Sequence, residues 1–133
     1  MAKVLIIDDE EPILKMYSAA LSGHEVLTAT DGDEGIKIAE QESPNLILLD
    51  IILPKINGLD VLEQLKNNQE TSSIPVVMLT NLPKEASADK ASALGADGYF
   101  VKAEFEPEKL ANEIEKLLRD GEEEEPAGTE EKQ

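Results

Sequence analysis

Residues 4–7 read VLII, an unbroken apolar run that ends at two aspartates. Two further runs of the same kind follow, LILL at residues 46–49 and VVML at residues 76–79. A strand with one wet face alternates apolar and polar residues, whereas a parallel strand that is covered on both faces is continuously apolar. These three runs therefore predict buried parallel strands, and residues 26–29 and 98–101 are shorter strand candidates.

Helical patterns fill the segments between these strands. Two apolar stripes have helical spacing, one made of Ile13, Tyr17, Ala20 and Leu21 and the other of Leu110, Ile114, Leu117 and Leu118. The helix that carries the stripe from Leu110 to Leu118 is expected to end at Gly121. Another helix is expected after Gly58, and the Ala-rich residues 85–94 predict a loosely held helix. Five strands that alternate with five helices predict an α/β fold, a doubly wound (βα)5 three-layer sandwich.

Composition limits the classes of function. The chain has 133 residues, enough for one domain, which we place at residues 1–120. Its net charge of −17 disfavours direct nucleic-acid binding, and the absence of cysteine fits a reducing compartment. No apolar run is long enough for membrane insertion, so we expect a soluble, cytoplasmic protein. Residues 121–133, GEEEEPAGTEEKQ, predict an acidic, disordered tail.

Chemically capable residues follow the predicted strands. The first strand ends at Asp8 and Asp9, the third at Asp50, the fourth at Thr80 and the fifth at Lys102. Because the carboxyl ends of parallel strands share one edge, these groups are expected to converge, at the edge where such folds bind ligands. Two unit charges about 4 Å apart repel by about 4 kcal/mol at an effective dielectric constant near 20. Three carboxylates and one lysine therefore predict a cation, raised pKa values or a functional role.

Each residue also has an ordinary structural interpretation. Asp8 or Asp9 could cap the first helix, Asp50 could cap a turn, Thr80 could be another cap, and Lys102 could form a surface ion pair. Taken together, however, an all-oxygen cluster without His or Cys suits a hard divalent ion such as Mg²⁺ or Mn²⁺. A carboxylate beside such an ion can attack phosphorus and form an aspartyl phosphate.

Four motifs carry a resemblance to a known family: VLIIDDEE, LILLDIILPKINGLDVL, VVMLTN and GADGYFVKA. In this order and at these separations they resemble the response-regulator receiver domains of two-component signal transduction. The resemblance covers about residues 3–119 and implies a flavodoxin-like sheet with strand order 2-1-3-4-5. It implies a stand-alone phosphorelay switch that takes its phosphoryl group from a sensor histidine kinase or phosphotransfer protein and binds a downstream protein target.

The resemblance also implies a role for each site residue. Asp50 matches the phosphoacceptor; Asp8, Asp9, Asp50 and the backbone carbonyl of Ile52 match the Mg²⁺ ligands. Thr80 and Lys102 match the phosphate-binding hydroxyl and lysine, while Thr80 and Tyr99 match the switch pair whose movement reshapes the face of the fourth helix, fifth strand and fifth helix. The expected chemistry is self-phosphorylation rather than conventional enzyme turnover. We expect a monomer, with dimerisation on phosphorylation left open.

The sequence departs from the family pattern at several positions near the site. Ala103 stands where proline usually follows the lysine, so the Lys102–Ala103 peptide could be either a costly cis bond or a trans bond. Asn81 is larger than the residue that usually follows the switch hydroxyl. Ile52 and Leu82 stand where the family's side chains flank the attacking water, and their apolar groups predict a long-lived phosphoryl group.

Three other interpretations stay open at this point. A flavin or nucleotide binder would need backbone donors after the first strand, where residues 8–11 instead carry negative charge. A Mg²⁺ phosphohydrolase would need a second acid near Asp50, but residues 51–53 are apolar. A degenerate receiver that only binds proteins is the third, and Ala103 is the residue that keeps it open.

Overall fold

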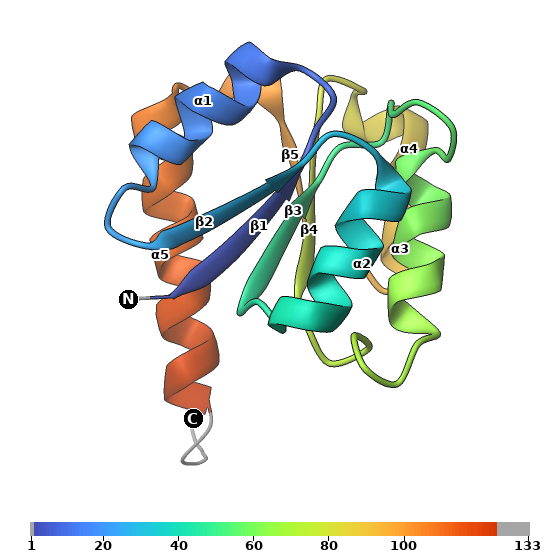
Figure 1. The fold of residues 1–133 in the computed structure, drawn as a ribbon. Coiled ribbons are helices and arrows are strands. Elements are labelled where there is room, and N and C mark those ends of the chain that lie inside the picture. Colours follow the sequence, from blue (N-terminus) through green and yellow to red (C-terminus); the bar gives the residue numbers. More distant parts are fainter. Residues whose placement is uncertain (1, 125–133) are drawn as a thin grey trace.

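The computed structural model describes residues 2–124, and its centre is one parallel sheet covered by helices on both faces (Figure 1). The strand order is β2-β1-β3-β4-β5, which confirms the predicted doubly wound topology. The predicted strands are all present, and three of them are one residue longer than expected: β1 (Lys3–Ile7), β2 (Glu25–Ala29), β3 (Leu46–Leu49), β4 (Val76–Thr80) and β5 (Gly98–Val101).

Within residues 2–124, five α-helices and one short 3₁₀-helix connect and follow the strands. They are α1 (Glu11–Ala20), α2 (Gly32–Glu42), α3 (Gly58–Lys66), α4 (Lys84–Ala93), η1 (Lys102–Glu104) and α5 (Pro107–Glu124). The prediction that the last helix closes at Gly121 is wrong, because α5 continues to Glu124. The predicted tail of residues 121–133 therefore overlaps α5 at residues 121–124, and residues 125–133 lie outside the described part of the chain, so the disorder of the tail stays a prediction. No helix of the described residues combines the length and the apolar character needed to cross a bilayer.

The three central strands are the core, as their continuous apolar sequences predict. Every residue of β3 and β4 is buried, and so are four of the five residues of β1. Helices α2, α3 and α4 cover one face of the sheet, while α1 and α5 cover the other (Figure 1). Such double burial requires apolar side chains on both sides of each strand, which explains why these sequences do not alternate.

The helices differ in how much apolar surface they bury. On α1 the buried residues are Leu14 and Tyr17, followed by Leu21 at the helix end, so the predicted stripe wrongly included Ala20 and omitted Leu14. On α4 only Ser87 and Ala91 are buried, in agreement with its weak amphipathic pattern. Helix α4 therefore has little apolar side chain with which to hold its place on the sheet.

Sheet register places the site residues at one edge. Ile7 of β1 pairs with Leu49 of β3, and the Asp50 amide donates to the Ile7 carbonyl at 3.0 Å, so the residues after the two strands are neighbours. In the next two strands of the sheet, Thr80 of β4 pairs with Val101 of β5, the residue before the lysine. The predicted convergence of these strand ends is thus a direct result of the parallel register.

A glycine allows helix α3 to start against the same edge. The Gly58 amide donates to the Ile51 carbonyl at 2.7 Å, and a Cβ atom at Gly58 would collide with the Asp50 carbonyl oxygen. Asn57 caps the helix by accepting hydrogen bonds from the Leu59 and Asp60 amides. The absence of a side chain at position 58 therefore sets the path of the loop that follows Asp50.

Candidate functional site

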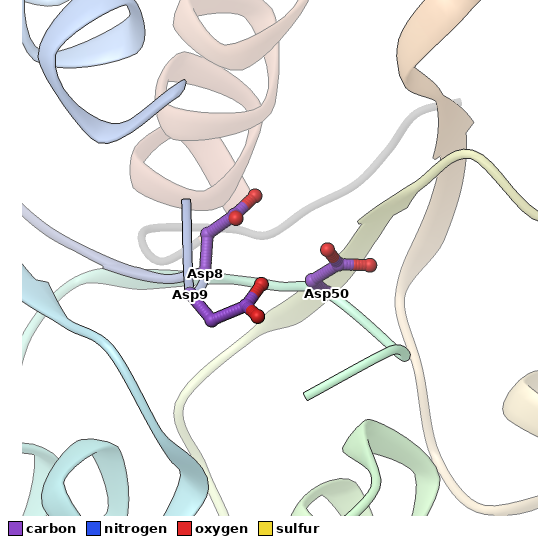
Figure 2. Close-up of side chains that lie close together, drawn as sticks. All are labelled: Asp8, Asp9 and Asp50. Atoms are coloured by element: carbon purple, nitrogen blue, oxygen red, sulfur yellow. The ribbon is translucent and has the colours of Figure 1, made fainter. Parts of the chain in front are cut away.

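Three carboxylates meet at the carboxyl edge of the sheet. Asp8 and Asp9 follow β1, Asp50 follows β3, and one oxygen from each lies within 4.8 Å of the others. Figure 2 shows the side chains of Asp8 and Asp9 on one segment and that of Asp50 on the neighbouring one, with the three carboxylates close together. Asp8 and Asp50 are buried, whereas Asp9 is exposed, so the cluster is open to solvent on one side.

Helix capping does not account for this cluster. The N-cap of α1 is Glu10, and its side chain makes no capping hydrogen bond. Asp8 Oδ1 instead accepts a 2.9 Å hydrogen bond from the Glu10 amide, which shapes the turn between β1 and α1. The second Asp8 oxygen and the Asp9 carboxylate are therefore available for other partners.

Lys102 lies between two of the carboxylates. Its Nζ atom is 2.6 Å from Asp8 Oδ2 and 2.9 Å from Asp50 Oδ2, and its side chain is only 7% exposed. Glu10 Oε1 lies 3.9 Å from the same nitrogen, which brings a fourth carboxylate to the rim of the site. The described residues contain no cis peptide bond, so the Lys102–Ala103 peptide is trans, and η1 turns the chain there without the usual proline.

The charges perturb the titration of the site. Burial raises the pKa of Asp8, because removal from water disfavours the ionised form, and Lys102 only partly offsets this. Burial alone would lower the pKa of Lys102, but its contacts with Asp8 and Asp50 outweigh burial and the pKa is raised. The lysine is therefore charged at neutral pH, and one of its partners holds a proton more tightly than an ordinary aspartate.

The donor set fits a hard divalent cation. Three carboxylates and one ammonium leave a local charge of −3 + 1 = −2, which a divalent ion would neutralise. The buried Asp8 Oδ2 accepts no well-directed hydrogen bond from the described residues, although the lysine is close. Carboxylate oxygens open to water on one side are the ligands that Mg²⁺ prefers, since it retains several waters.

The two oxygens of Asp50 are held differently. Oδ1 accepts hydrogen bonds from the Ile51 amide at 2.7 Å and from the Ile52 amide at 3.3 Å. Oδ2 is bound by Lys102 alone among the described residues. Ile52, whose amide contacts this carboxylate, is 61% exposed, so its apolar side chain faces solvent on the loop that follows Asp50.

Thr80 and Tyr99 are near the site but outside the carboxylate cluster. Thr80 is fully buried at the end of β4, and its hydroxyl accepts a long 3.4 Å hydrogen bond from the Leu82 amide. The Tyr99 hydroxyl donates to the Leu82 carbonyl at 3.0 Å and shares a 2.6 Å hydrogen bond with Ser87 Oγ. The structure thus gathers Asp8, Asp9, Asp50 and Lys102 in one cluster. The predicted switch pair lies in the neighbouring strands, with Thr80 at the end of β4 and Tyr99 in β5.

Comparison with protein families agrees with the geometry of this site. Residues 4–115 match the model of the response regulator receiver domain. The chain belongs to this family. Aspartyl phosphorylation and Mg²⁺ binding are typical of receiver domains, and the fold described above is the fold of the family.

Relatives and solved structures agree with this assignment. The receiver domain is 40% identical over 119 residues to the alkaline phosphatase synthesis transcriptional regulatory protein PhoP of Bacillus subtilis (strain 168), covering 88% of this chain and 48% of that protein. It is 38% identical over 121 residues to the DNA-binding dual master transcriptional regulator RpaA of Synechocystis sp. (strain ATCC 27184 / PCC 6803 / Kazusa), covering 90% and 50%. The chain spans about half the length of the curated relatives it matches.

Two solved structures cover almost the whole domain. Chemotaxis protein CheY4 of Vibrio cholerae superposes with a TM-score of 0.81 at 32% identity, covering 88% of this chain and 98% of that chain. A CheY-like receiver domain protein from Methanospirillum hungatei JF-1 has a TM-score of 0.84 at 30% identity, covering 93% and 98%. The relatives are regulators rather than conventional enzymes.

Sequence reasoning gave no role to two residues near this network. Glu10 lies near Lys102, and its position within the acidic run DDEE is the only feature of the sequence that could have indicated this contact. Ser87 contacts Tyr99 from helix α4, and a lone serine in an Ala-rich helix carries no signal of that contact.

Proposed function

We propose that this receiver domain is a phosphoacceptor switch in which Asp50 receives a phosphoryl group from a sensor histidine kinase or phosphotransfer protein. One observation carries the proposal: Lys102, buried and charged, lies between Asp8 and Asp50 in a cluster whose remaining charge is −2. A purely structural ion pair would need one carboxylate, not three. The cytoplasmic location expected from the cysteine-free composition stays a prediction.

The proposed transfer uses the less constrained oxygen of Asp50. Oδ1 is occupied by two backbone amides, so Oδ2 is the candidate nucleophile. Its bond to phosphorus forms as the bond from phosphorus to the donor breaks, and the donor leaves with that electron pair. The Lys102 ammonium would pair with the carboxylate before the transfer and with the negatively charged phosphoryl oxygens after it.

Asp8, Asp9, Asp50 and the Ile52 carbonyl would hold the metal ion. A bound Mg²⁺, or Mn²⁺ in its place, would neutralise charge on the phosphoryl group and the carboxylates. Asp9, the exposed carboxylate, would bind the ion directly, and the ion would keep several of its waters. Asp8 would contact the ion through one of those waters. These assignments follow the donor chemistry and the resemblance to the family.

The phosphorylated state would be passed on through the switch pair. A phosphoryl group adds about −1.5 to −2 charge and three acceptor oxygens, which the Thr80 hydroxyl could approach as a donor. Tyr99 would respond, and the face built from α4, β5 and α5 would change its affinity for a downstream protein. The similar transcriptional regulators PhoP and RpaA are about twice as long as this chain, so the DNA binding named for RpaA is not carried over.

Intact-mass measurement tests the central proposal. Wild-type protein incubated with acetyl phosphate and Mg²⁺ should gain one phosphoryl group, and Asp50→Asn should gain none. Asp89→Asn, which removes an exposed carboxylate from α4, is the matched control and should be labelled like wild type. A wild type that stays unlabelled by acetyl phosphate and by kinase or phosphotransfer donors would contradict the proposal and favour a domain that only binds proteins.

We further propose that the phosphoryl group is lost slowly. Ile52 is exposed beside Asp50, and the side chain of Leu82 packs against the apolar core, so neither can orient a water molecule for attack. In the presence of Mg²⁺, the Ile52→Asn, Leu82→Glu double variant should lose phosphate faster than wild type, by about tenfold if one water is newly oriented. Equal or slower loss in the double variant would contradict this part of the proposal.

A further inference from the structure

A chain of three hydrogen bonds runs from the site to helix α4. The Leu82 amide donates to Thr80 Oγ1 at 3.4 Å, and the carbonyl of the same residue accepts from the Tyr99 hydroxyl at 3.0 Å. The Tyr99 hydroxyl then meets Ser87 Oγ at 2.6 Å. Because Tyr99 uses its proton toward Leu82, the shared hydrogen of the last bond comes from Ser87.

Ser87 is an unusual residue for its position. It is 8% exposed on the side of α4 that faces the sheet, and Ala91 is the other buried residue of this helix. Neither side chain buries much apolar surface, so packing alone holds α4 weakly. The hydrogen bond to Tyr99 therefore adds to the weak packing that holds the helix, and burial of the serine hydroxyl makes its loss costly.

We propose that Ser87 is a positioning residue that makes the stability of α4 depend on the state of Thr80 through Tyr99 and the backbone of Leu82. This inference rests on the proposed function, in which the Thr80 hydroxyl moves toward a phosphoryl group on Asp50. That movement breaks the longest bond of the chain and frees the Leu82 amide, which lies on the other side of the Leu82 Cα atom from the carbonyl. The Leu82 carbonyl holds Tyr99, so the change reaches Ser87 and the helix.

Amide hydrogen exchange across residues 84–93 reports the stability of α4 directly. The exchange is measured before and after phosphorylation of Asp50 with acetyl phosphate and Mg²⁺. Ser87→Ala removes the hydroxyl with little change in volume, and Ser87→Thr keeps a hydroxyl at the same position. Ser92→Ala makes the same kind of change on the same helix, at an exposed residue.

Without phosphate, α4 of Ser87→Ala should exchange about threefold to tenfold faster than wild type, the loss expected for one net hydrogen bond. Phosphorylation should change α4 exchange in wild type, in Ser92→Ala and in Ser87→Thr. In Ser87→Ala that response should fall to less than half of the wild-type response on a logarithmic scale. A Ser87→Ala variant with the full wild-type response would overturn the inference, even if its helix were less stable.

A second measurement needs no phosphate. Thr80→Val removes the hydroxyl at the other end of the chain, so its effect on α4 exchange should be non-additive with that of Ser87→Ala. Additive effects would overturn the inference. Mass gain at Asp50 is recorded separately: a wild type that gains no mass contradicts the proposed function, and the non-additivity still decides whether the chain couples Thr80 to α4.

Discussion

Replacement of Asp8 by asparagine should stabilise the protein when divalent ions are absent. The substitution removes one negative charge from the cluster and keeps a side chain of similar size. Asp8 attracts Lys102 across 2.6 Å, which is worth about 6 kcal/mol at an effective dielectric constant of 20. Loss of this attraction would by itself make Asp8→Asn less stable than wild type. The sign of the change in stability therefore depends on the unfavourable interactions of the ionised Asp8.

Two opposing terms act on the same carboxylate. Repulsion from Asp50, within 4.8 Å, is about 3.5 kcal/mol at the same dielectric constant, and exposed Asp9 adds about 1 kcal/mol because water screens it. Burial of an ionised carboxylate costs several kcal/mol more, and it is the largest influence on Asp8, whose pKa is raised. The opposing terms together exceed the attraction, so the ionised form is disfavoured by the fold, and Asp8→Asn should be more stable than wild type at neutral pH.

Urea unfolding in the presence of a chelator measures this gain, and each kcal/mol corresponds to a rise in Tm of about 4 °C in a domain of this size. The folded pKa of Asp8 is raised, so wild type gains stability as the pH falls through that pKa. The advantage of Asp8→Asn should therefore be largest at neutral pH and shrink toward pH 3.8, the ordinary value for aspartate.

Magnesium should reverse the order, because it stabilises wild type through a ligand set that the variant lacks. Asp89→Asn, on the exposed side of α4, is the charge-matched control and should change neither result. An Asp8→Asn variant that is less stable than wild type in chelator at neutral pH would refute the reasoning, since the Lys102 attraction would then outweigh burial and repulsion.

Further predictions concern the lysine, the glycine and the metal. Lys102→Met leaves two buried carboxylates without their cation and should lower the free energy of unfolding by about 3 kcal/mol, whereas the exposed Lys109→Met should have no effect in the same urea titration. Gly58→Ala places a Cβ against the Asp50 carbonyl and should cost about 2 to 3 kcal/mol, while Gly23→Ala, with nothing within 4 Å, should cost nothing comparable; equal losses would refute the packing argument. Mg²⁺ added to wild type should raise Tm in proportion to the logarithm of its concentration above Kd, and Asp50→Asn should weaken this response.

Local sequence was sufficient for the sheet and for most of the helix positions. Unbroken runs such as LILL at residues 46–49 can be satisfied only by burial on both faces, so strand, parallel pairing and covering helices follow together. Parallel pairing also predicted that residues after different strands would meet at one edge. The helix ends were less certain, because an end depends on a balance of small terms: α5 continues past Gly121, and Leu14 rather than Ala20 faces the core.

Tertiary structure decided the contacts on which function depends. The sequence suggested a lysine loop disturbed by Ala103, but the folded chain turns through η1 with a trans peptide and still holds Lys102 between Asp8 and Asp50. The bond between Ser87 and Tyr99 joins residues twelve positions apart on a helix and a strand. A strand's apolar pattern is set by burial of consecutive residues and can be read locally, whereas such polar contacts depend on side-chain geometry that exists only after the sheet and helices have packed.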